Sequence, residues 1–441
     1  MDTASNLGCF SEAEASNVVR VVIEGGGGSL GRVIYVIESP FSNRDVERYG
    51  MVYLRSSGFE VEAWNVAPIY LPATENQWID APDDFLVRRF TSEDEIRTNC
   101  RALTSQDNVI LMSGVYLGQR RSQRTLIQEI SKSPAILGML SGDLPLAFET
   151  NFVVKSIFSD LSLARPRSWF DTCRRLFIRF LRRNSYKGSP SLLGRIERAV
   201  FGLRPLDFIW ASASVRNVCP HVIGPQTLIR YIHTQDFEAI RNKSFLSFVQ
   251  SNIAVYIDDM AFSHPDFESS YGVVLADLDL PLLNSGSYEA VCRALDQFEA
   301  DTGLQIEIAA HPRAEPGSLD HFFNGRNVRH GMSVDLLSKC HVMIQPSSST
   351  ITGLAVALER PIIILKSTSF ELLCQVAGQA LSKELKVPLV DIDAEDLKFE
   401  IPEIDKQAYA LYKKRYVKRA NSIDLPFWEV VARDLGAEPV N

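Results

Sequence analysis

Short apolar segments recur along the chain, each followed by a polar turn and a stretch with helical periodicity. Clear examples are VIYVIES (33–39), NVILMSG (108–114) and DFIWASAS (207–214). A run that is apolar on both faces is typical of a strand in a buried parallel sheet, which has helices on both sides. The pattern therefore predicts an α/β fold. After the first strand, Asn43 is expected to cap a helix that ends at Gly58.

A second series of such segments begins near residue 252. Its expected strands are 252–259, 304–313 and the apolar start of 341–367, and its expected helices include 288–303 and 333–340. We predict two Rossmann-like domains facing across a cleft, because ligands of open α/β sheets bind beyond the carboxyl ends of the strands. The predicted division is a flexible lead-in (1–31), a first domain (32–245), a second domain (246–400) and a C-terminal helical tail (401–441) that returns to the first domain.

Charge and cysteine content narrow the class of protein. The chain has 46 Lys and Arg against 54 Asp and Glu, a net charge of −8, which argues against general nucleic-acid binding. Its seven cysteines form no CxxC pair, as in proteins of a reducing compartment. The N-terminus lacks the apolar core of a secretory signal, and no apolar run approaches the roughly 20 residues of a membrane helix. We therefore expect a cytoplasmic protein.

The strongest candidate site is the turn Pro346–Thr350, PSSST, between a strand and a helix. Its hydroxyls and amides suit a phosphate group, although an ordinary N-cap with surplus serines has the same pattern. His311 and Arg313 end the preceding strand, where an imidazole and a guanidinium suit phosphate oxygens. The alternative is a satisfied histidine and a surface arginine.

Acidic residues end a third strand. Asp258 and Asp259, with His264 and Asp266 as secondary candidates, offer a general base, because paired carboxylates can differ in pKa. They could equally cap a turn or bind an arginine. Two Asp-x-Asp triplets, 277–279 and 391–393, are too short to indicate a metal, and the histidines lack zinc-site spacing, so neither metal nor cofactor is expected.

One segment, 165–198, differs from the rest of the chain in charge. It holds ten Lys and Arg against two acids, a local charge of +8, and its aromatic residues fall on one helical face. Such a helix either lies on an anionic membrane surface or packs its aromatic face on the core.

The second half also resembles a known family. The runs VYIDDMAFSHPDF (255–267), IAAHPR (308–313) and the segment from His330 to Leu365 are similar to bacterial capsule and lipopolysaccharide biosynthesis proteins. They are also similar to bacterial sialyl-, polysialyl- and Kdo-transferases, which are glycosyltransferases of the GT-B type. The sialyltransferase pattern has glycine after the acid pair, where this chain has Met260.

The resemblance implies roles for the candidate residues. His311 would contact the donor phosphate and assist its departure, helped by Ser347, Ser348, Ser349 and Thr350, while Asp258 or Asp259 would supply the general base. The implied partners are a nucleotide-sugar donor and a glycan or lipid-linked glycan acceptor, with the enzyme peripheral at the inner face of the inner membrane.

Several functions fit this pattern. We expect a metal-independent glycosyltransferase that moves a CMP-activated nonulosonic or Kdo-like sugar to a bacterial surface polysaccharide. A UDP- or GDP-sugar enzyme and a non-catalytic glycan- or partner-binding protein are the alternatives. A two-domain epimerase and a polyol-phosphate transferase also fit the phosphate chemistry.

Overall fold

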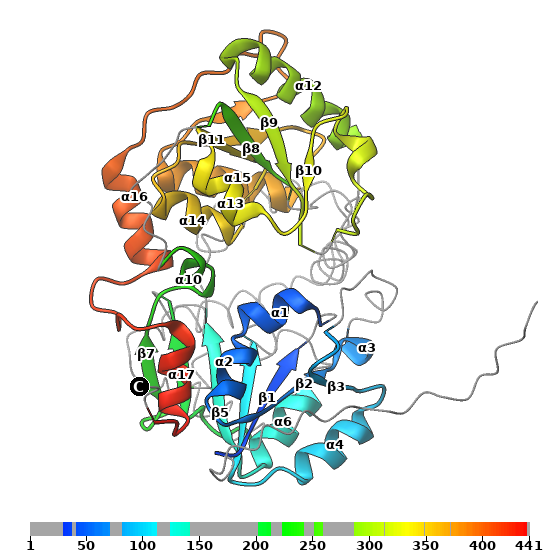
Figure 1. Ribbon diagram of the computed structural model, residues 1–441, viewed down its shortest axis with the longest axis vertical. Helices are drawn as coiled ribbons and strands as arrows, with labels where there is room; N and C mark the ends of the chain where they lie inside the picture. Colours follow the sequence, from blue (N-terminus) through cyan, green and yellow to red (C-terminus); the bar gives the residue numbers. More distant parts are fainter. Residues whose placement is uncertain are drawn as a thin grey trace, which may run out of the picture.

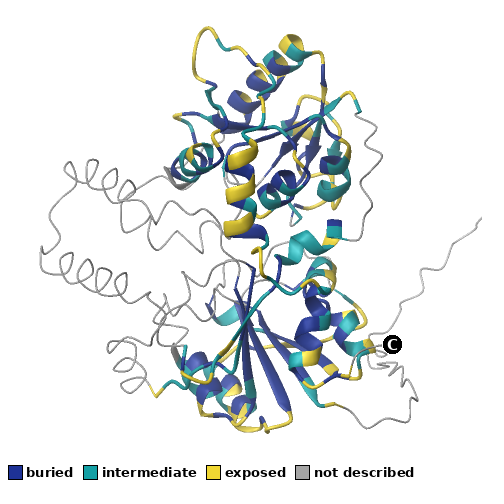
Figure 2. Cartoon of the chain, turned by 90° about the vertical axis from the view of Figure 1, so that its left-hand side faces the viewer, coloured by how far each residue is buried: buried dark blue, intermediate teal, exposed yellow. Residues whose placement is uncertain are grey.

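The computed structural model describes residues 30–438, except 38–40, 71–81, 113–123, 142–201, 213–222, 242–250, 259–285, 313, 348 and 371. These residues form two parallel β-sheets with helices on their faces (Figure 1). Buried residues are concentrated in the strands and on the inward sides of the helices (Figure 2). No helix in this part of the chain is long and apolar enough to span a bilayer.

The first sheet has seven parallel strands in the order β3-β2-β1-β4-β5-β6-β7. They are β1 (Arg32–Ile37), β2 (Glu60–Asn65), β3 (Leu86–Arg89), β4 (Asp107–Met112), β5 (Ile136–Ser141), β6 (Phe208–Ala211) and β7 (Leu228–Tyr231). Val33 and Tyr35 of β1 pack on one face of the sheet, whereas Ile34 and Val36 pack on the other. Burial on both faces explains why this segment is apolar without interruption.

Helices cover both faces of this sheet. They are α1 (Asn43–Arg48), α2 (Met51–Ser56), α3 (Ala67–Tyr70), α4 (Glu93–Arg101) and α6 (Arg124–Lys132). The helix α10 (Gln235–Arg241) follows β7, but its Ile240 is buried in the core of the second unit. The apolar residues of α4 and α6 pack with Ile34 and Val36, and those of α1 and α2 pack with Val33 and Tyr35.

The helix expected from Asn43 to Gly58 is in fact two helices, and its N-cap is Ser42. The amide and hydroxyl of Ser42 donate to the carboxylate of Asp45 at 3.0 and 2.9 Å. The helix breaks at Gly50, which has a left-handed φ of 55°. A Cβ at Gly50 would collide with the ring of Trp428, so a contact from the far end of the chain requires glycine here.

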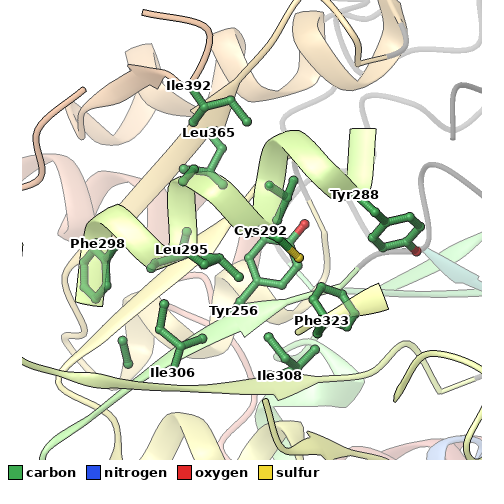
Figure 3. Close-up of a cluster of buried hydrophobic side chains, with 14 of the residues drawn as sticks. Tyr256, Tyr288, Cys292, Leu295, Phe298, Ile306, Ile308, Phe323, Leu365 and Ile392 are labelled. Atoms are coloured by element: carbon green, nitrogen blue, oxygen red, sulfur yellow. The ribbon is translucent and has the colours of Figure 1, made fainter. Parts of the chain in front are cut away.

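The second sheet has six strands in the order β10-β9-β8-β11-β12-β13, and all of its neighbouring pairs are parallel. They are β8 (Ile253–Ile257), β9 (Gln305–Ala309), β10 (Val328–Arg329), β11 (Val342–Gln345), β12 (Ile362–Lys366) and β13 (Leu389–Asp391). Its helices are α12 (Gly286–Thr302), the 3₁₀-helix η5 (Asp320–Phe322), α13 (Ser333–Lys339), α14 (Ile351–Ala357) and α15 (Leu372–Leu385). Residues of α12 pack on one face of this sheet (Figure 3), and residues of α13, α14 and α15 pack on the other.

The C-terminal segment joins the two units. It comprises α16 (Lys406–Tyr412), a π-helical turn η6 (Lys413–Val417) and α17 (Phe427–Asp434). Tyr409 and Tyr412 of α16 pack in the second unit, whereas Phe427 and Trp428 of α17 pack on the first sheet (Figure 1). The predicted fold class, two Rossmann-like units with a C-terminal helix that returns to the first, is confirmed.

Candidate functional site

Polar residues follow four neighbouring strands of the second sheet, β10-β9-β8-β11, at their carboxyl ends. The register pairs Tyr256 with Ile344 and Ile257 with Ala309. Two residues further along the strands, Asp258 therefore lies level with Pro346, and it donates its amide to the oxygen of Ala309 at 3.0 Å. The sheet thus brings together Asp258, His311, His330 and the turn that begins at Pro346 at one edge.

Asp258 is a buried carboxylate with a phenol beside it. Its side chain accepts a hydrogen bond from the hydroxyl of Tyr288 at 3.4 Å, and the residue is 1% exposed. Tyr288 lies in the first turn of α12, where its ring stacks on Phe322 with the ring centroids 4.6 Å apart. Its ring also meets the edge of Phe323, with centroids 5.5 Å apart (Figure 3). The aromatic cluster therefore holds the donor that orients the carboxylate.

Small residues of α15 pack against the turn that follows β11. The thiol of Cys374 contacts the oxygen of Pro346 at 3.5 Å. A Cβ on Gly378 would lie 3.0 Å from that same oxygen, closer than most Cβ contacts in proteins. A larger residue at position 378 would push the turn outward, so the position of the turn depends on this glycine.

A buried hydrogen bond between Gln345 and Thr352 also holds this turn in place. The amide of Gln345 donates to the hydroxyl of Thr352 at 3.0 Å, and both residues are at most 1% exposed. The amide of Ser349 reaches the same hydroxyl at 3.5 Å. This pair ties the last residue of β11 to the first turn of α14, which determines the path of the residues between them.

Two hydroxyls of the turn are not used to cap α14. Thr350 is the N-cap residue, but its side chain makes no capping hydrogen bond and is exposed. The Oγ atom of Ser349 is buried and has no hydrogen-bond partner in the part of the chain that the structure describes. An ordinary N-cap would use its hydroxyl for the helix amides. These two side chains therefore remain available for a ligand.

Two histidines lie beside this turn. His311 is partly buried, and its carbonyl accepts the amide of Ala314 at 2.9 Å, which closes a turn after β9. His330 directly follows β10, and its Nε2 atom is buried without a hydrogen-bond partner among the described residues. His330 was not among the residues predicted from sequence, because the strand before it has only two residues, Val328 and Arg329, and leaves no hydrophobic pattern.

The remaining predicted residues divide into two groups. Several predicted residues lie outside the described part of the chain, so their roles stay predictions: Asp259, His264, Asp266, Arg313, Ser348 and the segment 165–198.

The triplet 391–393 is described and has a structural role. Asp391 pairs with Lys366 at 2.8 Å, and Asp393 accepts bonds from the hydroxyl of Ser367 and the amide of Thr368. Burial opposes ionisation of Asp393, but these hydrogen bonds outweigh it and lower its pKa.

The turn also lies close to the junction with the first unit. A Cβ on Gly353, in the first turn of α14, would lie 3.1 Å from the side chain of Val417 in η6. The carbonyl of Val417 accepts the amide of Thr234, which follows β7 of the first sheet, at 2.9 Å. The polar edge of the second sheet therefore borders the carboxyl edge of the first.

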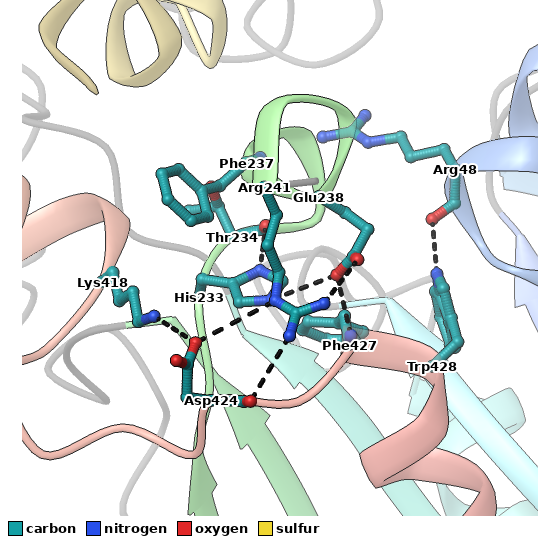
Figure 4. Close-up of polar contacts among 10 residues, drawn as sticks. All are labelled: Arg48, His233, Thr234, Phe237, Glu238, Arg241, Lys418, Asp424, Phe427 and Trp428. Atoms are coloured by element: carbon teal, nitrogen blue, oxygen red, sulfur yellow. Dashed lines mark hydrogen bonds and ion pairs between the residues drawn. The ribbon is translucent and has the colours of Figure 1, made fainter. Parts of the chain in front are cut away.

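Buried polar contacts hold this junction together (Figure 4). His233 is fully buried, with Nδ1 2.9 Å from the oxygen of Thr234 and Nε2 3.1 Å from the carboxylate of Glu238. Glu238 also accepts the amide of Phe427, the first residue of α17, at 2.8 Å. One carboxylate of α10 therefore links the end of the first sheet to the returning C-terminal helix.

No family model matches the chain, and no curated protein matches it. Three matching solved structures show the level of similarity. Spinosyn forosaminyltransferase SpnP is 10% identical over 93% of this chain and 95% of its own, with a TM-score of 0.38. UGT2 of Phytolacca americana, complexed with UDP-2-fluoro-glucose and pterostilbene, is 11% identical over 92% and 93%, with a TM-score of 0.39. A UDP-N-acetylglucosamine 2-epimerase is 11% identical over 88% and 87%, with a TM-score of 0.35. The resemblance to bacterial surface-carbohydrate enzymes therefore stays a prediction from sequence.

Proposed function

We propose that this protein is a glycosyltransferase that takes its sugar from a nucleotide-sugar donor. The observation that carries the proposal is the row of strand ends in the second sheet. It places a buried carboxylate at Asp258, an imidazole at His311 and two uncommitted hydroxyls at Ser349 and Thr350 on one edge. A protein that only binds a glycan has no need of all three.

The hydroxyl turn is proposed as the phosphate site. A departing nucleotide gathers negative charge on its phosphate oxygen, and donors aimed at that oxygen stabilise the transition state. Ser349 and Thr350 would donate from the turn and His311 from the neighbouring strand, with Ser347, Ser348 and Arg313 as further predicted contacts. Because α14 has only seven residues, hydroxyl and amide donors matter more here than a long helix dipole.

The acid pair is proposed to activate the acceptor hydroxyl. Asp258 is oriented by Tyr288, and Asp259 follows it directly in the chain. We assign the general base to one of the two and an electrostatic role to the other. Loss of a general base typically lowers turnover by about 10²–10⁴-fold, so Asp258→Asn and Asp259→Asn should differ from each other in turnover much more than in nucleotide affinity.

The donor is proposed to carry UDP or GDP ahead of CMP. Met260 replaces the glycine that follows the acid pair in the sialyltransferase pattern, which weakens the case for a CMP-linked acidic sugar. UDP is also the nucleotide of the Phytolacca americana complex and is the first to test. An epimerase remains the second candidate, because a nucleotide-sugar epimerase is among the matching structures.

Calorimetric titration of UDP, GDP and CMP into the full chain tests the proposal. Ser349→Ala and Thr350→Val should each weaken nucleotide binding by about 0.5–3 kcal/mol, the range for one hydrogen bond. Ser338→Ala is the control, because its hydroxyl bonds within α13 at the opposite edge of the sheet. His311→Ala should lower donor hydrolysis more than it lowers affinity. Equal affinities in wild type and all variants would remove the phosphate site, and an epimerised free sugar in the assay would favour the second candidate.

A further inference from the structure

The helix α1, which contains Arg44 and Arg48, lies at the end of the first unit that is nearest the second unit (Figure 1). Arg44 and Arg48 are four residues apart, so their side chains share one face of the helix. The charge of Asp236, in the first turn of α10, acts on both guanidinium groups. The pair therefore lies at the carboxyl edge of the first sheet, beside the junction with the second unit.

Arg48 already has a carboxylate nearby. Its Nη2 atom lies 3.5 Å from Asp236, and Figure 4 shows its guanidinium turned toward α10. Burial by itself would lower the pKa of Arg48, but the attraction of Asp236 outweighs it and raises that pKa. The Nε atom of Arg48 is nevertheless buried with no hydrogen-bond partner in the described part of the chain.

Arg44, unlike Arg48, has no ion pair with a carboxylate among the described residues. Within the described ranges it makes no ion pair and no hydrogen bond, and the carboxylate of the adjacent Asp45 already accepts both donors of Ser42. Burial lowers the pKa of Arg44, and repulsion by Arg48 lowers it further. A partly buried guanidinium with unused donors costs free energy, which a bound anion would offset.

We infer that Arg44 and Arg48 form an oxyanion site that holds an acidic group of the acceptor, either a sugar carboxylate or a phosphate. The planar fork of arginine matches both groups in a bidentate geometry. The assignment to the acceptor rests on the proposed function, in which the second unit binds the donor, because the two arginines belong to α1 of the first unit.

The test titrates three probes into the full-length chain and follows its thermal unfolding at constant ionic strength. The probes are inorganic phosphate, D-glucuronate and, as the neutral control, D-glucose. A ligand that binds the folded state raises the unfolding temperature, because it stabilises that state by RT ln(1 + [L]/Kd). Arg44→Gln should weaken binding of at least one of the two anions by about tenfold or more, the effect of losing charged hydrogen bonds. Arg44→Lys should keep part of that affinity because it keeps the charge.

Controls separate this inference from the proposed function. Arg101→Gln alters an exposed arginine at the far end of α4 and should leave anion binding unchanged. Ser349→Ala and Thr350→Val, each made in the wild-type and in the Arg44→Gln background, should leave the difference in anion affinity between the two backgrounds unchanged. Preference for phosphate indicates a phosphate-bearing acceptor, and preference for glucuronate indicates an acidic sugar. Equal anion binding by wild type and Arg44→Gln overturns the inference, as does a matching loss of UDP affinity in Arg44→Gln. Failure of UDP to bind any variant would instead count against the proposed donor.

Discussion

Trp428 donates its indole Nε1–H to the backbone oxygen of Arg48 across 3.1 Å, which joins residues 380 positions apart in the chain. The contact makes α17 part of the core of the first unit, although α16 packs in the second. It also fixes the backbone of Arg48 while Asp236 attracts its guanidinium. The returning helix thus helps to position the proposed oxyanion site.

The packing of Trp428 against Gly50 predicts a large cost for Gly50→Ala. An added Cβ would meet the indole ring, and position 50 has a φ of 55° that alanine adopts only with strain. We expect a loss of about 3–5 kcal/mol in the free energy of unfolding, from strain and overpacking together. Gly303→Ala is the matched control, because its φ is 71° but nothing lies within 4 Å of the added atom. In urea unfolding, the control should lose only about 1–2 kcal/mol in the free energy of unfolding, from backbone strain alone. Equal losses in the two variants would contradict the packing argument.

The junction carboxylate Glu238 predicts a pH-dependent contribution to stability. Burial by itself would raise its pKa, but hydrogen bonds from His233 and the amide of Phe427 outweigh it and lower that pKa. Because the folded value lies below the unfolded value of about 4.3, the stabilisation is present above that pH and is lost as pH falls through the folded value. Glu238→Gln should cost about 1–2 kcal/mol at pH 7 and progressively less below pH of about 4. Glu395→Gln alters an exposed acid and is the control, which should change the free energy of unfolding by less than about 0.5 kcal/mol at pH 7.

The Gln345–Thr352 pair predicts that stability and ligand binding will change together. Thr352→Val leaves the buried amide of Gln345 without its partner, which should cost about 1–3 kcal/mol in unfolding free energy. The same change should weaken nucleotide binding, because the pair determines the path of the turn. Thr352→Ser keeps the hydroxyl and should retain most of both properties. If the valine variant bound nucleotide as tightly as the serine variant, the pair would have no role in placing the turn.

Buried thiols predict slow chemical labelling. Burial raises the pKa of both Cys100 and Cys340 to about 12, so almost no thiolate is present near neutral pH. We expect neither residue to react with a thiol reagent at pH 8 in the native protein and both to react in urea. Mass spectrometry of the labelled peptides distinguishes them from the other cysteines. Rapid labelling of either residue in the native chain would show that its part of the core opens readily.

Much of the fold follows from local pattern. The apolar runs at 33–39, 108–114 and 252–259 contain strands β1, β4 and β8, because a strand covered on both faces must be apolar throughout. The turn Pro346–Thr350 and the polar ends of β8 and β9 were also predictable, since parallel strands place their carboxyl ends on one edge. Edge strands such as β3 and β10 were missed, because each is short and only partly buried.

The sequence by itself determined the parallel α/β class, the two units and the edge at which their polar residues gather, because these depend on hydrophobic periodicity within short segments. Only the tertiary structure decided the break at Gly50 and the grouping of His330 with His311. It also decided the burial of Arg44 next to the positive charge of Arg48. Each of these depends on a contact or a register between segments far apart in the chain. Trp428, for example, requires glycine at position 50 from the opposite end of the sequence, and local patterns carry no information about such contacts.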